Sequence, residues 1–203
     1  MVRIDPPPPR RSTSPLIEIL PMAAALLRIY RPEPYGSSAC GFRYDGPFSR
    51  FDHHANGHPR GIHYSAPSLS SCVVEVFGDT GVIDPKGCQL ALLRTNRPIA
   101  VLDLRGSGAM RAGSVAALNA TADRSLSQQW SRFFYGTAVA DERPIDGLLY
   151  SNAHNGEAAL ALYERAEAAI HCAAELPLAA NELRSRLLAV ANDHGMTMAP
   201  FGF

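Results

Sequence analysis

One glutamate stands where an unpaired carboxylate is rarely found. Glu75 lies between Val74 and Val76 in the stretch "SCVVEVF", and Tyr64 stands on a strand-like stretch just before it. Apolar neighbours would hold this carboxylate in place and strengthen its field by lowering the local dielectric. The same neighbours make ionisation costlier, so hydrogen bonds must compensate. Such a group can stabilise positive charge that develops on a reacting molecule. The alternative is a partly exposed glutamate at the edge of a helix.

Several arginines precede Tyr64 and Glu75 in the sequence. Arg28 and Arg31 stand in "RIYR", and Arg43, Arg50 and Arg60 follow in the loop region before Tyr64. The planar guanidinium group can hold a phosphate by two parallel hydrogen bonds, and it keeps its charge when desolvated. Several arginines around one cleft would therefore suit a dinucleotide. Ordinary surface arginines are the alternative.

A cluster of histidines offers a second kind of chemistry. Asp52, His53, His54, His58 and His63 all fall in "FDHHANGHPRGIH". Zinc would need three or four of these to converge, and no H-E-x-x-H helix or cysteine–histidine pair supports such a site. We therefore expect no metal. A serine hydrolase is not expected either, because the G-x-S-x-G elbow is missing, and no glycine-rich Rossmann or P-loop motif is present.

Composition narrows the class of protein. The chain has 203 residues, 46% of them hydrophobic, and its nineteen basic residues balance its nineteen acidic ones. This suits one domain with a sizeable core and gives no overall field toward nucleic acid or an anionic membrane. The four cysteines show no C-x-x-C spacing, which favours a reducing, cytoplasmic setting. The apolar stretch 15–30 is too short to span a bilayer and is interrupted by Glu18 and two prolines, so we expect no export and no membrane partner.

The elements that must position these residues follow from patterns along the chain. Residues 1–24 begin with four consecutive prolines and are expected to be a flexible Pro/Arg-rich arm, followed by a single domain over residues 25–203. Residues 32–61 are rich in Gly, Pro and Ser, and a stretch of this length without secondary structure is usually functional or disordered. Short apolar runs predict strands, and helical spacing predicts three helices. The strands are expected near 26–30, 61–66, 88–95, 98–104, 146–152 and 157–164, and the helices near 67–78, 124–140 and 179–195. This order is neither strictly alternating nor all-β, so we predict an α+β fold.

Four stretches together resemble a known family. "RIYR", "SRFD", "GIHYSAPSLSSCVVEVF" and "DGLLYSNAHNGEAALALYER" look like the successive signatures of the RES-domain family, named for its Arg, Glu and Ser. The resemblance runs from about residue 26 to about residue 165. It implies a fold similar to ADP-ribosyltransferases, with a small mixed β core flanked by helices. It also implies NAD as the substrate and a role as the toxin of a bacterial RES–Xre toxin–antitoxin pair.

The resemblance gives roles to Glu75 and Tyr64. Breaking the bond between nicotinamide and ribose develops oxocarbenium-like charge on the sugar, and a fixed carboxylate stabilises that charge more in the transition state than in the ground state. Glu75 is expected to supply this carboxylate. The ring of Tyr64 can stack on the nicotinamide and attract its positive charge.

The remaining roles fall on cations and on one small polar residue. The resemblance makes Arg31 the family's first arginine, a catalytic residue, and Arg50 its second basic position, and both are expected to grip the pyrophosphate of NAD. Ser151 is expected to bind ribose or phosphate. Asn152 is its competitor, because the family commonly has one residue between its tyrosine and its serine, whereas Ser151 follows Tyr150 directly.

The expected partners are an Xre-type antitoxin, NAD and an acceptor of ADP-ribose, which could be water, phosphate or a protein target. No direct binding of nucleic acid is expected. The alternative function is a non-catalytic protein that keeps the fold in order to bind NAD or a partner.

Overall fold

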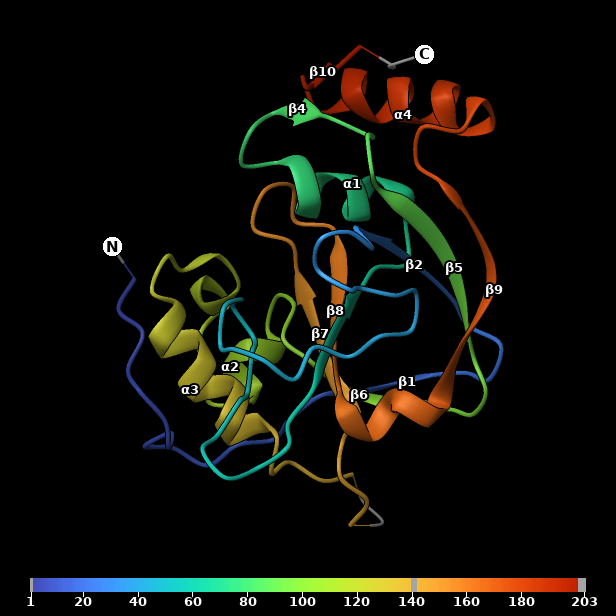
Figure 1. Ribbon diagram of the computed structural model, residues 1–203. Coiled ribbons are helices and arrows are strands. Elements are labelled where there is room, and N and C mark those ends of the chain that lie inside the picture. The colour runs from blue at the N-terminus through green and yellow to red at the C-terminus, as the bar shows by residue number, and fades with distance from the viewer. Residues whose placement is uncertain (1, 140–141, 201–203) are drawn as a thin grey trace.

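The computed structural model describes residues 2–139 and 142–200, and two β-sheets form its centre (Figure 1). The larger sheet has the strand order β1-β6-β7-β8-β3, the smaller sheet has the order β2-β5-β9, and β4 pairs with β10. The strands are β1 (Ile17–Leu20), β2 (Ala25–Tyr30), β3 (Ile62–Ser65), β4 (Val82–Ile83), β5 (Gln89–Thr95), β6 (Ile99–Asp103), β7 (Gly147–Ser151), β8 (Ala158–Tyr163), β9 (Ile170–Pro177) and β10 (Thr197–Met198). The helices are α1 (Leu69–Phe77), α2 (Gly108–Arg111), α3 (Arg124–Phe134) and α4 (Asn181–Asp193), with the 3₁₀ segments η1 (Ala116–Ala120) and η2 (Glu164–Ala169). The expected α+β class is confirmed.

Apolar side chains fill the layers on both faces of the larger sheet. One core lies between the two sheets and includes Leu93, Val101 and Leu162. The core on the opposite face of the larger sheet packs Leu102 and Leu148 against the aromatic side of α3. Strand β6 is buried on both faces, which explains why its sequence is an uninterrupted apolar run.

The two sheets also join through backbone hydrogen bonds. The amide of Leu27 on β2 donates to the carbonyl of Ala66 just after β3 at 2.7 Å, and the amide of Ala66 donates back to Leu27 at 2.9 Å. This single antiparallel bridge holds β2 beside the end of β3. It therefore fixes Arg28 close to the strand that carries Tyr64.

Helix α1 forms as its sequence predicts. The hydroxyl oxygen of Ser68 accepts a hydrogen bond from the amide of Ser71 at 3.0 Å and so caps the first turn, while Gly78 follows the last helical residue. The helix buries Cys72, Val73 and Phe77 against β2, β8 and α4. Glu75 lies on the side of the helix that is left open.

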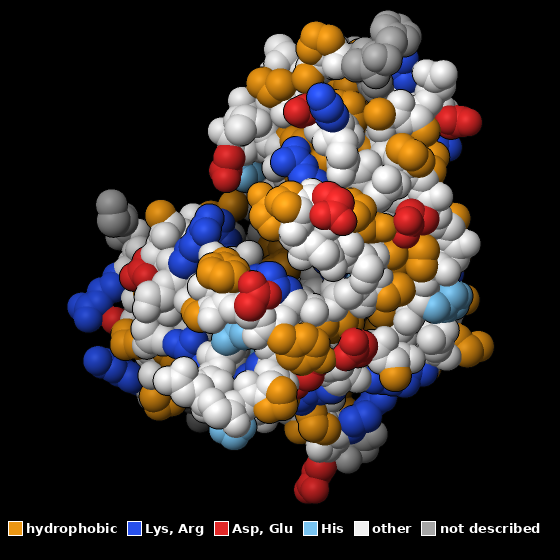
Figure 2. Space-filling view, viewed as in Figure 1, with side chains coloured by type: hydrophobic (Ala, Val, Ile, Leu, Met, Phe, Trp, Pro, Cys, Tyr) orange, Lys and Arg blue, Asp and Glu red, His pale blue; other side chains and the backbone are white. Residues whose placement is uncertain are grey.

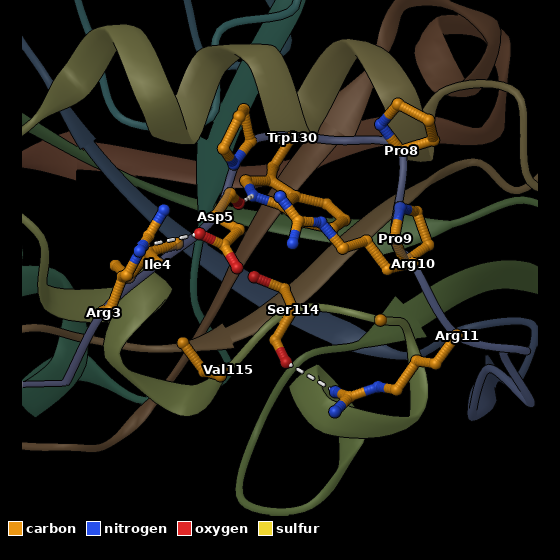
Figure 3. A pocket seen from close by; sticks show the side chains of 12 residues that line it. Arg3, Ile4, Asp5, Pro8, Pro9, Arg10, Arg11, Ser114, Val115 and Trp130 are labelled. Carbon is orange, nitrogen blue, oxygen red and sulfur yellow. Dashed lines mark hydrogen bonds and ion pairs between the residues drawn. The ribbon is translucent and has the colours of Figure 1, made fainter.

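The N-terminal arm packs against α2 and α3. The indole of Trp130 donates to the carbonyl of Asp5 at 2.9 Å, and Arg11 donates to the carbonyls of Met110 and Ser114. The arm, the segment after α2 and Trp130 of α3 line a cavity of about 220 Å³, and Figure 3 shows the side chains around it. Side-chain to backbone hydrogen bonds thus attach the arm at Asp5 and at Arg11.

Part of the expected arm, residues 1–24, has regular secondary structure. Ile17–Leu20 forms β1, which pairs antiparallel with β6 and closes one edge of the larger sheet. The free backbone groups of β6 accept this short apolar stretch despite the prolines around it. Strand β9 was also not expected, and α3 ends at Phe134 rather than near residue 140. No helix within the described residues is long and apolar enough to cross a bilayer.

Candidate active site

A narrow pocket opens where β2, β3, β7 and α1 meet, next to the bridge between the sheets. Its volume is about 50 Å³. One cation, one anion and two tyrosines line it together with small apolar groups. Its lining includes Arg28, Tyr64, Cys72, Glu75, Val76 and Tyr150. We call this cavity the tyrosine pocket.

Glu75 lines the tyrosine pocket and also a second, polar cavity. Its side chain remains exposed to solvent, but protein atoms surround the carboxylate on the pocket side. This burial raises the pKa of Glu75 above its usual value, while Arg50, His154 and the hydroxyl of Tyr150 oppose the shift. The carboxylate thus combines an apolar flank with nearby groups that favour its ionised form.

Tyr64 points its ring into the pocket and its hydroxyl away from it. The hydroxyl donates to Oδ1 of Asp52 at 2.9 Å and accepts from the amide of Phe51 at 3.2 Å. Burial and the negative charge of Asp52 raise the pKa of Tyr64 well above its usual value. The phenol thus stays neutral, and only the ring is presented to a ligand.

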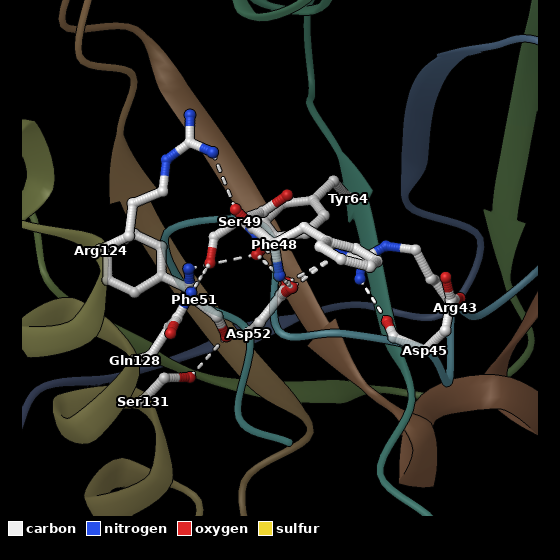
Figure 4. Close-up of polar contacts among 10 residues, drawn as sticks. All are labelled: Arg43, Asp45, Phe48, Ser49, Phe51, Asp52, Tyr64, Arg124, Gln128 and Ser131. Atoms are coloured by element: carbon white, nitrogen blue, oxygen red, sulfur yellow. Dashed lines mark hydrogen bonds and ion pairs between the residues drawn. The ribbon is translucent and has the colours of Figure 1, made fainter. Parts of the chain in front are cut away.

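Asp52 holds the loop that supports Tyr64 (Figure 4). Its fully buried carboxylate accepts hydrogen bonds from Nη2 of Arg43 at 2.8 and 2.7 Å, from the amide of Phe48 at 2.6 Å and from the amide of Ser49 at 2.9 Å. We call these groups, with Tyr64, the Asp52 cluster. The cluster orders a loop that has no regular secondary structure, because one carboxylate replaces the missing backbone partners.

Arg28 lines the tyrosine pocket and also a neighbouring, larger cavity. Its Nη1 donates to the carbonyl of Gly41 at 3.0 Å and contacts Nδ1 of His63. Burial lowers the pKa of Arg28 to about 10. Among the described residues, no carboxylate lies within ion-pair distance of this guanidinium. A partly buried cation that has no carboxylate partner among the described residues is costly, so the arrangement favours an anionic ligand.

Tyr150 also lines the pocket, although the sequence alone predicted no role for it. The side chain is buried, its ring lies 4.7 Å from the ring of Phe51, and its hydroxyl lies 3.4 Å from Oε1 of Glu75. The alternation of side chains along β7 could have placed Tyr150, because it puts Tyr150 on the same face of the sheet as Leu148, the face that packs against α3 and also carries Tyr64.

A second pocket lies on the other side of Glu75. It has a volume of about 510 Å³ and a polar lining that includes Arg50, Arg124 and His154. Arg50 donates through Nη1 to the carbonyl of Thr121. Arg50 therefore reaches Glu75 from this polar pocket and not from the tyrosine pocket.

Arg31 lies away from both cavities. Its Nε donates to the sulfur of Cys88 at 3.2 Å, and its side chain lines a third pocket that also contains Asp84. Neighbours three residues apart on an extended chain point to opposite sides, so Arg28 and Arg31 cannot face the same cavity. The structure brings Arg28, and not Arg31, together with Tyr64 and Glu75.

Comparison with known proteins places the chain in a family. The family model described as RES domain matches residues 25–184, which is most of the chain. The chain belongs to the RES-domain family. It is 34% identical over 86 residues to a probable toxin, y4kH, of Sinorhizobium fredii. That match covers 42% of this chain and 65% of the relative, just under two thirds of its length.

The fold of this RES domain has a solved counterpart. A chain in the crystal structure of the M. tuberculosis MbcT–MbcA toxin–antitoxin complex is similar to it, with a TM-score of 0.57 and 18% sequence identity. The similarity covers 84% of this chain and 92% of that one. It confirms the expected fold, which the family resemblance had assigned to the ADP-ribosyltransferase type.

Neither candidate for the family serine lines the tyrosine pocket of this RES domain. Ser151 is half-buried at the end of β7, opposite Ala158. Asn152 is buried, donates to the carbonyl of Ser71 at 3.3 Å and accepts from the amide of His154 at 2.9 Å. Asn152 thus ties α1 to the turn after β7.

Two buried histidines of this RES domain, His53 and His63, have different partners. His53 is buried and contacts Oε2 of Glu164 at 2.9 Å, whereas His63 lies at Arg28 on the face of β3 opposite Tyr64. Within the described residues, no three His, Cys, Asp or Glu side chains form a group that could hold a metal ion.

Proposed function

We propose that this RES domain cleaves NAD between nicotinamide and ribose and transfers the ADP-ribose to an acceptor. One observation carries the proposal: the carboxylate of Glu75 and the guanidinium of Arg28, which has no carboxylate partner among the described residues, line one pocket together with two tyrosines. NAD matches this arrangement, because its cationic nicotinamide riboside is joined to an anionic pyrophosphate.

In this proposal the electron pair of the glycosidic bond leaves with the nicotinamide nitrogen, which becomes neutral, and positive charge develops on the ribose. Glu75 stabilises that charge as it forms. The rings of Tyr64 and Tyr150 hold the nicotinamide, and Arg28 binds the pyrophosphate. This assignment moves the phosphate-binding role proposed for Arg31 to Arg28 and leaves Arg50 beside Glu75, on the polar side.

The acceptor attacks the ribose carbon after nicotinamide has left. Water, phosphate and a protein side chain each carry an oxygen or nitrogen that can form this bond and lose a proton to the surrounding solvent. Ser151 and Asn152 lie behind the pocket, so we assign them a supporting role in holding β7 and α1. No metal takes part in the proposed reaction.

We further propose that the protein is a toxin that a cognate antitoxin of the Xre type neutralises. The names of the similar proteins support this role, since one is called a probable toxin and the other belongs to a toxin–antitoxin complex. The four free cysteines fit a reducing cytoplasm. Expression without the partner should stop growth, and expression of Glu75→Gln should not.

The decisive experiment incubates the purified protein with NAD and measures free nicotinamide. Mass spectrometry of the second product then identifies the acceptor. We expect release by the native protein and a strong loss with Glu75→Gln. Calorimetric binding of NAD without any nicotinamide release would instead favour the non-catalytic function and refute the proposal.

A further inference from the structure

A larger pocket begins where the tyrosine pocket ends, because Arg28 lines both cavities. Its volume is about 560 Å³, in the range of small-molecule sites. Four aromatic side chains line it: Tyr35, Phe42, Tyr44 and Phe48. We call it the aromatic pocket. In Figure 2, hydrophobic side chains gather in the middle of the face where Figure 1 draws the loop of residues 32–61.

Phe48 presents an exposed ring on a fixed backbone. Its side chain is 57% exposed, yet its amide donates to Asp52 and its carbonyl accepts from Nη1 of Arg124 at 2.8 Å. The guanidinium of Arg43 lies 5.0 Å from the ring centre. An aromatic ring held this firmly and left open to solvent is a stacking surface for a flat ligand.

Tyr44 is held in a similar way. Its side chain is 47% exposed, and its hydroxyl donates to Oε2 of Glu167 at 2.8 Å. Its ring packs on Gly61, where a Cβ atom would come within 2.8 Å of the ring. The close approach of Gly61 keeps the ring of Tyr44 in place beside the pocket.

We propose that the aromatic pocket holds the adenine of NAD, with Phe48 as its principal stacking partner. The inference rests on the proposed function and extends it from the reacting half of NAD to the other half. If Arg28 binds the pyrophosphate, the nicotinamide riboside lies toward Glu75 and the adenosine continues beyond Arg28. A purine has a π face that stacks on aromatic side chains.

Two other cavities share lining residues with the tyrosine pocket, and both fit adenine less well. The polar pocket joins the tyrosine pocket at Glu75, the end assigned to the ribose that reacts. The pocket around Arg31 shares only the apolar Ile29 and Val76 with the tyrosine pocket, so a pyrophosphate would have to cross a surface without a shared cation.

The test compares two substrates that differ in the adenosine half. Nicotinamide mononucleotide has the nicotinamide, the ribose and one phosphate but lacks AMP. With Phe48→Ala, we expect kcat/KM for NAD to fall roughly 5- to 150-fold, the size of effect that one lost base–aromatic stack produces. The value for the mononucleotide should stay within about twofold of the native value. Phe48→Tyr keeps the ring and should behave as the native protein does.

A control variant addresses the competing cavity. Val82→Ala changes an exposed side chain of the pocket around Arg31 and should leave both substrates unaffected. An equal loss for both substrates with Phe48→Ala, or a loss specific to NAD with Val82→Ala, would overturn the inference.

The inference and the proposed function can fail separately. If the native protein releases no nicotinamide from either substrate, the proposed reaction is wrong, and binding of ADP measured by calorimetry takes over as the test. Weaker ADP binding by Phe48→Ala than by the native protein would then support an adenine site. Equal binding, or no ADP binding by the native protein, would overturn it.

Discussion

Replacing Asp52 by Asn tests whether one buried carboxylate orders the loop around the site. The carboxylate accepts five hydrogen bonds: two from Arg43 and one each from Phe48, Ser49 and Tyr64. An amide is nearly the same shape but replaces one acceptor oxygen by a donor. If the new NH₂ group takes the place of Oδ1, the bonds from Tyr64 and Arg43 are lost, and in the place of Oδ2 the two backbone amides and Arg43 lose their acceptor.

The magnitude follows from this geometry. Breaking a buried ion pair by removing one partner costs about 3–5 kcal/mol. The side chain of Arg43 is 28% exposed, so water compensates in part and we expect the lower end, about 3 kcal/mol. For a domain of this size each kcal/mol shifts the Tm by about 2–4 °C, which gives a decrease of about 6–12 °C.

Thermal and urea unfolding followed by circular dichroism would measure this change. Asp45→Asn is the matched control, because Asp45 is an exposed acid of the same loop and only its backbone carbonyl contacts Arg43. Its effect should stay within about 0.5 kcal/mol. Nicotinamide release by Asp52→Asn, measured below its Tm, should fall as Tyr64 loses its anchor. A Tm within about 2 °C of the native value would refute the reasoning.

Three further predictions follow from the same contacts. Glu75→Gln should lower kcat for nicotinamide release by about 10²–10³-fold without lowering the Tm, and retention of more than a tenth of the native rate would contradict its role. Arg28→Met should weaken NAD binding in calorimetry and yet raise the Tm, because it removes a buried cation that has no carboxylate partner among the described residues; a lower Tm would argue against that cost. Burial raises the pKa of Glu164, but hydrogen bonds from His53 and Tyr135 outweigh it and lower the pKa to about 2. The folded value therefore lies below the unfolded one, so the stabilisation is complete above about pH 4.5 and is lost as the pH falls toward 2. Urea unfolding between pH 2.5 and 6 should show a smaller loss for Glu164→Gln than for the native protein, and parallel curves would exclude this source of acid sensitivity.

Local patterns predicted the elements that carry the pocket. The capping serine and following glycine of α1, and the alternation around Tyr64, are properties of neighbouring residues, and they define the helix and strand that hold Glu75 and Tyr64. The same local view misses β1 and β9. Both are edge strands whose pairing depends on distant partners, β6 and β5, and β9 has mostly exposed side chains without a clear apolar alternation.

Local sequence patterns do not predict which arginine faces the tyrosine pocket. Arg28 and Arg31 stand in the same short motif, and nothing in their spacing says which of them will face the cavity. The choice depends on the backbone bridge between Leu27 and Ala66, which turns Arg28 toward β3. Asp52 likewise stood among histidines that suggested metal chemistry, whereas its actual partners are Arg43, Tyr64 and two backbone amides.

The pair of backbone hydrogen bonds between Leu27 and Ala66 joins the two sheets beside the tyrosine pocket. The geometry of this pocket therefore depends on how the two sheets are placed relative to each other. The guanidinium at one end is carried by the smaller sheet, whereas the phenol rings belong to the larger one. A protein that bound across both sheets and altered their mutual tilt would therefore change the reach between cation and carboxylate. Such a partner would inhibit the reaction without inserting any residue into the tyrosine pocket.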